Sequence, residues 1–312
     1  MNPNELLFVE KYRPQKVSEC ILPTETLKNL QDIIESGVIP NLLFVGTAGI
    51  GKTTVAHALG REMGYDVLFV NASNEGRSID TLRGVVTDFA STMSLSSNRK
   101  LVILDEFDGT GQIVQDALRA FVELYSATCS FIITCNFKHK LLDAIRSRFG
   151  ETNFNIPSDQ KKKLSIDFMK RVVDILKKEG ITYEANAVAE LVKRHFPDFR
   201  RVLVELQRYS SSGSFSLEQL KTTELDLDNI ITLIKDKNFS QMVLEIEKQA
   251  TIDINNTATQ LYDNADKFCQ KQSKPALIQV LAEYIDKATR TTNPKITIMA
   301  MYADIMINVE MT

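Results

Sequence analysis

The stretch from Gly46 to Thr53 reads GTAGIGKT and fits the pattern G-x-x-x-x-G-K-[ST] at every fixed position. In such a loop the glycines let backbone N–H groups approach a phosphate chain, and the helix that follows adds a partial positive charge at its N-terminus. Lys52 is then expected to reach the terminal phosphates of a nucleotide, and the Thr53 hydroxyl to bind Mg²⁺. The alternative, a glycine-rich turn that binds nothing, is disfavoured because the lysine and the hydroxyl stand where this chemistry needs them.

Two acids follow an apolar segment further along the chain, where Leu101–Leu104 is succeeded by Asp105 and Glu106. Asp105 is expected to hold the Mg²⁺ shell, and Glu106 to orient or deprotonate the attacking water. A strand that ends in an acidic turn is common, so this pattern does not decide the matter alone. Downstream of a phosphate-binding loop, it predicts nucleotide hydrolysis.

Strands and helices that would position these residues alternate through the first half of the chain. Apolar runs of strand length occupy residues 41–45, 67–71, 100–105, 130–136 and 152–156. Nearly continuous apolar strands separated by helices predict an α/β fold with a parallel sheet that is covered on both faces. Ligands of such sheets bind at the carboxyl ends of the strands, so the phosphate-binding loop, Asp105 and Asn136 are expected to converge.

The character of the sequence changes after Pro157. Ser158 is a plausible helix N-cap, and amphipathic helices are expected at 161–178, 185–195 and 200–209. The serine-rich segment 210–214 reads as a boundary loop, and from there to the end the periodicity is helical only, with no strand. The final helix, Pro294 to Val309, is apolar nearly all round, so it needs either its own domain or a neighbouring subunit to cover it. We therefore expect domains at 1–157, 158–212 and 213–312.

Composition sets the class of protein. The 312 residues are 44% apolar and 25% charged, which is typical of a globular protein. No run of 18 apolar residues and no signal pattern occur, so a cytoplasmic protein without a membrane segment is expected. The four cysteines and three histidines have no metal-ligand spacing, and the cysteines are interpreted as reduced thiols. With a net charge of −3, contact with nucleic acid would have to come from a local basic surface.

Several further motifs identify a family. They are VEKYRP at residues 9–14, NASN at 71–74, QDALR at 115–119, ITCN at 133–136, RSRF at 146–149 and PDFRR at 197–201. With these motifs the chain resembles the AAA+ ATPases of sliding-clamp loaders and is similar to the small subunits of replication factor C over about residues 6–210. The short chain and the PDFR sequence look most like the large ATPase subunit of a T-even-type phage clamp loader.

This resemblance implies an architecture and partners. The expected fold is an AAA+ P-loop ATPase with a parallel five-stranded sheet, followed by a small helical lid domain and a helical C-terminal collar domain for oligomerisation. The implied cofactors are ATP and Mg²⁺. The chain would form a hetero-oligomeric ring with copies of itself and a small loader subunit, and would load a sliding clamp onto primer-template DNA without reading its sequence. If the chain is phage-encoded, its location would be the bacterial host cytoplasm.

The resemblance also assigns roles by position. Asn136 would be sensor 1, Arg200 would be sensor 2, and Arg148 would be an arginine finger that completes the site of the adjacent subunit in trans. Nucleotide binding would involve the phosphate-binding loop, residues next to the adenine and sensor 2: Tyr12, Arg13, Pro14, Ile21, Gly46, Thr47, Ala48, Gly49, Ile50, Gly51, Lys52, Thr53, Thr54 and Arg200. Arg148 and Arg200 could instead form ordinary surface salt bridges. Tyr12 and Pro14 could instead serve only to pack an N-terminal arm.

DNA contacts in this family grip phosphates from the inside of a spiral, and the candidates here are Arg77, Ser78 and Arg83. A solvated helix face is the alternative for both arginines. Arg119 could relay DNA binding to the ATP site, or it could be an ordinary surface residue. The chain departs from the family pattern in three places: GTAGIGKT lacks the usual prolines, Phe149 replaces a cysteine, and residues 74–76 precede Arg77 where a tighter acidic run is usual.

Two other functions compete with clamp loading. One is a different AAA+ DNA remodeller, such as a branch-migration helicase, or an unfoldase. The YRP opening and the SRF finger argue against it, and the absence of pore-loop aromatics further weakens the unfoldase. The other is a non-catalytic scaffold subunit of the same loader, which the intact Lys52, Thr53, Asp105 and Glu106 disfavour.

Overall fold

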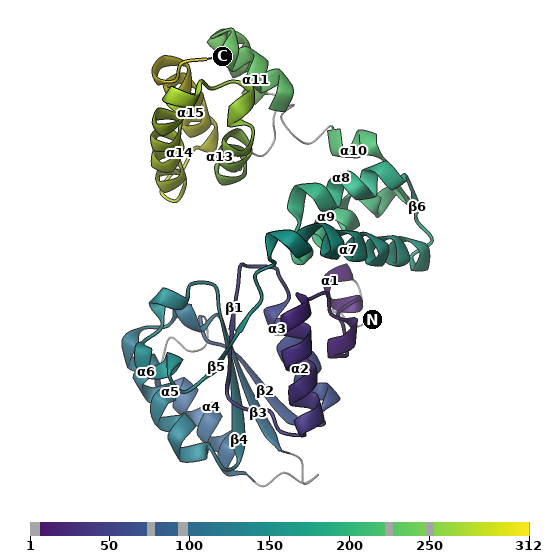
Figure 1. The fold of residues 1–312 in the computed structure, drawn as a ribbon, viewed down its shortest axis with the longest axis vertical. Helices are drawn as coiled ribbons and strands as arrows, with labels where there is room; N and C mark the ends of the chain where they lie inside the picture. The colour runs from purple at the N-terminus through teal and green to yellow at the C-terminus, as the bar shows by residue number, and fades with distance from the viewer. Residues whose placement is uncertain (1–6, 74–78, 93–98, 222–226, 248–252, 312) are drawn as a thin grey trace. The chain divides into compact units, whose positions relative to one another are not determined.

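The computed structural model describes residues 7–73, 79–92, 99–221, 227–247 and 253–311. The chain divides into two units, Met1–Leu217 and Glu218–Thr312. The first holds the sheet and a group of helices, and the second is helical (Figure 1).

A five-stranded sheet forms the centre of the first unit, in the order β2-β3-β4-β1-β5. Its strands are β1 (Leu42–Val45), β2 (Asp66–Asn71), β3 (Lys100–Asp105), β4 (Cys129–Cys135) and β5 (Gly150–Asn153). Every pairing between neighbouring strands is parallel. The predicted parallel five-stranded sheet is therefore confirmed.

Alternate residues of the central strands enter two different cores, which is why these strands read as continuous apolar runs. Leu43 and Val45 of β1 pack with the helices α4 (Ile79–Ser91) and α5 (Gln112–Tyr125). Leu42 and Phe44 pack with α2 (Thr24–Ser36) and α3 (Lys52–Glu62) on the opposite face. Figure 1 shows these two pairs of helices on either side of the sheet. The short helix α6 (Asp143–Arg146) precedes β5.

Three helices after the sheet form a smaller group within the first unit. They are α7 (Ser158–Lys178), α8 (Ala185–His195) and α9 (Phe199–Tyr209), joined by a parallel pair of two-residue strands, β6 (Thr182–Tyr183) and β7 (Ser214–Phe215). A short helix at the N-terminus, α1 (Phe8–Lys11), contacts this group through the hydrogen bond from Phe8 N–H to Gln207 Oε1, 2.9 Å. We call residues 158–216 the lid and residues 7–22 the arm.

The expected element bounds differ from the structure in a few places. β5 begins and ends earlier than 152–156 because it pairs with β1, which stops at Val45 where the phosphate-binding loop begins. Ser158 is not an N-cap; it is the first residue of α7, and Pro157 holds the cap position. The expectation of no strand after residue 210 is wrong, because β7 lies at Ser214–Phe215. A strand of two residues is too short to leave a periodic pattern in the sequence. The domain division that we expected after residue 212 falls before β7, so it would separate β7 from its partner strand β6.

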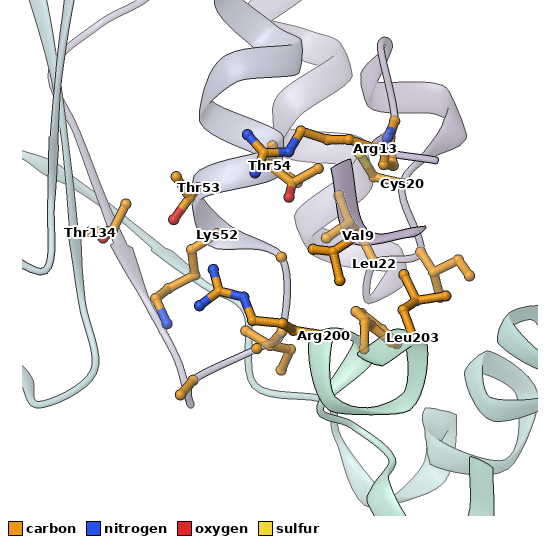
Figure 2. Close-up of a pocket in the computed structure, with 18 of the residues that line it drawn as sticks. Val9, Arg13, Cys20, Leu22, Lys52, Thr53, Thr54, Thr134, Arg200 and Leu203 are labelled. Atoms are coloured by element: carbon orange, nitrogen blue, oxygen red, sulfur yellow. The ribbon is translucent and has the colours of Figure 1, made fainter. Parts of the chain in front are cut away.

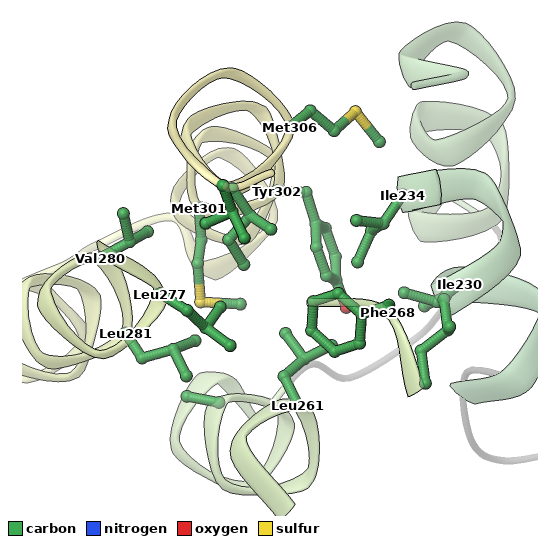
Figure 3. Packing of buried hydrophobic residues seen from close by; sticks show 14 of the residues in the cluster. Ile230, Ile234, Leu261, Phe268, Leu277, Val280, Leu281, Met301, Tyr302 and Met306 are labelled. Atoms are coloured by element: carbon green, nitrogen blue, oxygen red, sulfur yellow. The ribbon is translucent and has the colours of Figure 1, made fainter. Parts of the chain in front are cut away.

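Where the second unit is described, five α-helices build it, together with α10 (Leu217–Lys221) at the division. They are α11 (Leu227–Lys235), α12 (Phe239–Glu247), α13 (Ile254–Asp263), α14 (Lys274–Ala288) and α15 (Pro294–Asn308). Figure 3 shows Met301, Tyr302 and Met306 of α15 directed into the core between the helices. Ile296 and Ile307 on the same helix are 64% and 75% exposed. The last helix is thus covered by its own unit on one side only.

Candidate active site

The phosphate-binding loop connects β1 to α3, and its conformation depends on glycine. Gly49 and Gly51 have φ values of +74° and +98°, a region in which side chains with a Cβ are strained. Gly51 immediately precedes α3, and Lys52 is the first residue of that helix. The loop therefore presents the N-terminus of an 11-residue helix to whatever occupies it.

Lys52 lies at the centre of the site. Its Nζ donates to Gly46 O at 2.7 Å, to Thr47 O at 2.8 Å and to Asn136 Oδ1 at 2.8 Å. The side chain is buried, and this burial lowers the pKa of Lys52, while the charge of Asp105 opposes the shift. Asn136 stands directly after β4, so the structure brings this expected sensor to the lysine.

The two expected metal ligands meet as well. Thr53 Oγ1 donates to Asp105 Oδ1 at 2.5 Å, and Thr134 Oγ1 donates to the same oxygen at 2.7 Å. Asp105 is buried at the end of β3. A hydroxyl and a carboxylate are the oxygen ligands that Mg²⁺ takes beside nucleotide phosphates. No cluster of three or more His, Cys, Asp or Glu side chains that could hold a metal occurs in the described part of the chain.

Glu106 has a left-handed backbone conformation, with φ of 54°, which is uncommon for a residue with a side chain. Its N–H donates to Thr134 Oγ1 at 3.1 Å, and its Oε2 accepts from Ser73 Oγ at 2.8 Å. Residues in sparsely populated backbone regions concentrate at functional sites. Ser73 therefore holds the carboxylate that was expected to act on water, and Thr134 holds the backbone N–H of Glu106.

Asp108 is a further part of the site that the sequence analysis did not single out. It is buried, and its Oδ2 accepts from the N–H groups of Asn136 at 3.2 Å and Phe137 at 2.9 Å. A carboxylate on the chain after β3 thus fixes the backbone at the end of β4. Thr134 could have been found from its spacing, since it stands two residues before Asn136 and faces the same side of the strand. No spacing rule would have found Asp108.

The arm borders the other end of the pocket. Tyr12, Arg13, Pro14 and Ile21 line it, as the sequence analysis expected, and α7 adds Arg171. Within the described residues, Arg13 Nε is buried without a hydrogen-bond partner. Figure 2 shows Arg13 and Cys20 on one side of the pocket and Lys52 on the other. An unsatisfied buried donor at this place is consistent with a bound ligand.

The lid closes the pocket from the side of α9. Phe199 N–H donates to Gly49 O at 3.1 Å, and a Cβ built on Gly49 would lie 1.8 Å from Asp198 Oδ1. Arg200 follows in the first turn of the helix, lines the pocket and extends toward Lys52 (Figure 2). Side chains of the arm, the phosphate-binding loop and the lid thus line one pocket that is open to solvent.

Two expected residues, Arg148 and Arg119, lie outside the pocket lining, and the side chains of three others are not described. Arg148 does not line the pocket; its Nη2 donates to Glu123 Oε1 at 2.6 Å and its Nη1 to Ala144 O at 2.7 Å. Arg77 and Ser78 lie outside the described residues, and the same holds for the side chain of Arg83, whose backbone belongs to α4. Arg119 is exposed on α5, away from the pocket lining. Among the residues described, no helix is long and apolar enough to span a membrane.

Two family models match the chain. Residues 42–156 match the ATPase family associated with various cellular activities (AAA), and residues 160–216 match the AAA+ ATPase lid domain of the sliding-clamp-loader large subunit. The matched ranges correspond to the sheet with its helices and to the lid.

Similar proteins share much of this sequence. The sliding-clamp-loader large subunit of Enterobacteria phage T4 is 36% identical over 249 residues, covering 78% of this chain and 77% of the relative. The replication factor C small subunit of Methanothermobacter thermautotrophicus is 31% identical and covers 95% and 96%. A solved structure of the Thermotoga maritima RuvB Holliday junction branch migration motor matches with a TM-score of 0.54 and 17% identity, over 80% of this chain and 85% of that one. At that identity the likeness concerns the fold alone.

Proposed function

The chain belongs to the AAA+ ATPases of the sliding-clamp-loader family, and from this premise we propose that it is the motor subunit of a loader. It opens a sliding clamp and places it on primer-template DNA, driven by ATP hydrolysis. The observation that carries the proposal is that two hydrogen-bonded pairs, Lys52 with Asn136 and Thr53 with Asp105, line one pocket. Arg200 of the lid lines the same pocket.

The phosphate end of the pocket is formed by Lys52 and the N-terminus of α3. The three acceptors of Lys52 Nζ are all neutral oxygens, so its charge remains available to a phosphate. Arg200 adds a second cation from the lid, which lets the lid respond to the nucleotide. Thr53 and Asp105 would hold Mg²⁺, which neutralises phosphate charge when it is bound with ATP.

Hydrolysis depends on Glu106, which orients the attacking water and takes its proton. Its carboxylate accepts a hydrogen bond from the Ser73 hydroxyl, so this bond must break or shift before Glu106 can act on the water during hydrolysis. Asn136 orients the same region of the phosphate chain, and Asp108 fixes its backbone.

Arg148 serves the nucleotide of the neighbouring subunit. Its guanidinium is bound to Glu123, whose side chain is 56% exposed, so the pair can be exchanged for a phosphate when subunits assemble. An arginine supplied in trans is worth roughly a thousandfold or more in turnover. A single subunit is therefore a poor ATPase, and the ring is the active form.

The assembled ring contains copies of this chain and a different small subunit, and each copy has an AAA+ domain at 1–157, the lid and a C-terminal helical collar. Arg77, Ser78 and Arg83 grip DNA phosphates, which makes binding independent of sequence and sensitive to salt. Clamp and primed DNA together stimulate hydrolysis. A scaffold subunit without activity is disfavoured because Lys52, Thr53, Asp105 and Glu106 are all present.

The test is a loading experiment with the reconstituted complex. Labelled clamp, the loader and ATP are mixed with circular DNA that carries one primer, and clamp on DNA is separated from free clamp by gel filtration. We expect clamp on the primed circle only with ATP and with intact Lys52. Equal retention without ATP, or on unprimed circles, would reject clamp loading in favour of another AAA+ remodeller.

A further inference from the structure

The arm that borders the nucleotide pocket packs on the ATPase core only toward its C-terminal end, through Val17, Cys20 and Leu22. Val17 is fully buried among core side chains of α2 and α3, and its N–H donates to Glu62 Oε2 at 2.8 Å. The residues on either side of Val17 line the pocket, including Pro14 and Cys20. The position of the segment before Val17, which includes Pro14, therefore depends also on contacts with the lid.

The lid holds the arm on both sides of Val17 through Arg171 of α7. Arg171 Nη1 donates to Glu19 O at 2.7 Å, and Nη2 donates to Tyr12 O at 3.0 Å. Eight residues further, at the C-cap of the same helix, is Glu179, whose Oε1 accepts from Lys11 Nζ at 2.6 Å and from the Tyr12 hydroxyl. That spacing keeps both side chains on one side of α7.

Arg171 is suited to this contact by its planar group. The two terminal nitrogens of a guanidinium point in fixed directions and can bind two separate carbonyl oxygens, whereas an ammonium acts as a single point. No carboxylate lies within 4.0 Å of Arg171 in the described ranges, so its bonds to the arm do not compete with an ion pair. The guanidinium also lines the pocket, and burial lowers the pKa of Arg171, with Cys20 and Glu19 opposing the shift.

We propose that Arg171 is the positioning residue for the adenine end of the pocket. By binding Tyr12 O and Glu19 O together, it fixes the part of the arm that receives the base. Lys52, Thr53 and the helix N-terminus hold the phosphates without it. Loss of Arg171 thus weakens recognition of the base and leaves recognition of the phosphates intact. The inference rests on nucleotide binding at this pocket.

The experiment compares two ligands that share the phosphate chemistry and differ in the base. Binding of ATP and of inorganic tripolyphosphate, each with Mg²⁺, is measured by calorimetry on the full chain and on Arg171→Met. ATP is expected to bind about tenfold more weakly to the variant, a change of about 1.4 kcal/mol, while tripolyphosphate binds within about twofold of the wild type. Lys170→Met is the matched control, because Lys170 is the exposed neighbour on α7 and pairs with Asp167.

Arg171→Lys is a second variant in case Arg171→Met does not fold, because the lysine keeps the positive charge. Its single ammonium can reach only one of the two carbonyl oxygens. It should lose part of the ATP affinity and none of the tripolyphosphate affinity. Equal losses for both ligands, or no loss for ATP, in whichever variant folds would overturn the role of Arg171. A wild-type chain that binds neither ligand would overturn the nucleotide site itself, and with it this inference.

Discussion

Replacing Asp108 should destabilise the chain and slow ATP hydrolysis, because this buried carboxylate accepts two consecutive N–H groups at the end of β4. Asp108→Ala leaves the N–H groups of Asn136 and Phe137 without that acceptor. A buried donor that loses its partner costs about 1–3 kcal/mol. Because Asn136 is only partly buried and Phe137 is exposed, we expect a total loss of about 3 kcal/mol in the free energy of unfolding, toward the lower end for two donors.

The functional effect follows from Asn136. Once its backbone is released, its side chain no longer meets Lys52 at a fixed place, and misplacement by about 1 Å can cost up to roughly a hundredfold in rate. We therefore expect kcat of the assembled loader to fall roughly 10- to 100-fold, with a smaller change in KM. Asp108→Asn keeps a neutral acceptor and should lie between the wild type and Asp108→Ala.

Urea unfolding of the chain and steady-state ATPase assays of the loader measure the two effects. Asp143→Ala is the control, since Asp143 has a 92% exposed side chain in a surface pair with Arg146 and should change stability by no more than about 0.5 kcal/mol. If Asp108→Ala were as stable and as active as Asp143→Ala, the assignment of Asp108 to the site would be wrong.

Three further substitutions test separate parts of the site. Lys52→Ala removes the cation on the phosphates and should abolish turnover and weaken nucleotide binding in a filter or calorimetric assay; near-normal turnover would remove Lys52 from the mechanism. Glu106→Gln keeps the shape without the base, so ATP binding and the open clamp complex should persist while phosphate release nearly stops; fast phosphate release would exclude Glu106. Arg148→Ala should keep each subunit's own nucleotide affinity and cut turnover of the ring roughly a thousandfold. Mixing it with Lys52→Ala subunits should restore part of the rate, and a ring that turns over at wild-type speed would leave Arg148 a surface residue.

The sheet and the centre of the site could be predicted because their signals are local. Continuous apolar strands followed by Gly46, Asp105 and Asn136 place these residues at one edge of a parallel sheet, and the structure brings them within hydrogen-bonding reach of Lys52 and Thr53. The chain order alone is sufficient for that step.

The remaining contacts depend on distances through space that no pattern encodes. Ser73 meets Glu106, and Asp108 meets the backbone of Asn136, only because β2, β3 and β4 are neighbours in the sheet. Arg171 lies 159 residues from Tyr12 in sequence, and its helix looks like any amphipathic helix with a basic face. The bounds of β5 could not be predicted either, since the partner strand sets them.

The central claim is that ATP is hydrolysed in this pocket and that this hydrolysis drives clamp loading. Its most direct measurement is the steady-state ATPase rate of the ring reconstituted with its small subunit, taken alone, with clamp, with primed DNA and with both. The account predicts the highest rate with clamp and primed DNA together, and no rate with Lys52→Ala under any condition. A rate that is the same with and without clamp and primed DNA would contradict it.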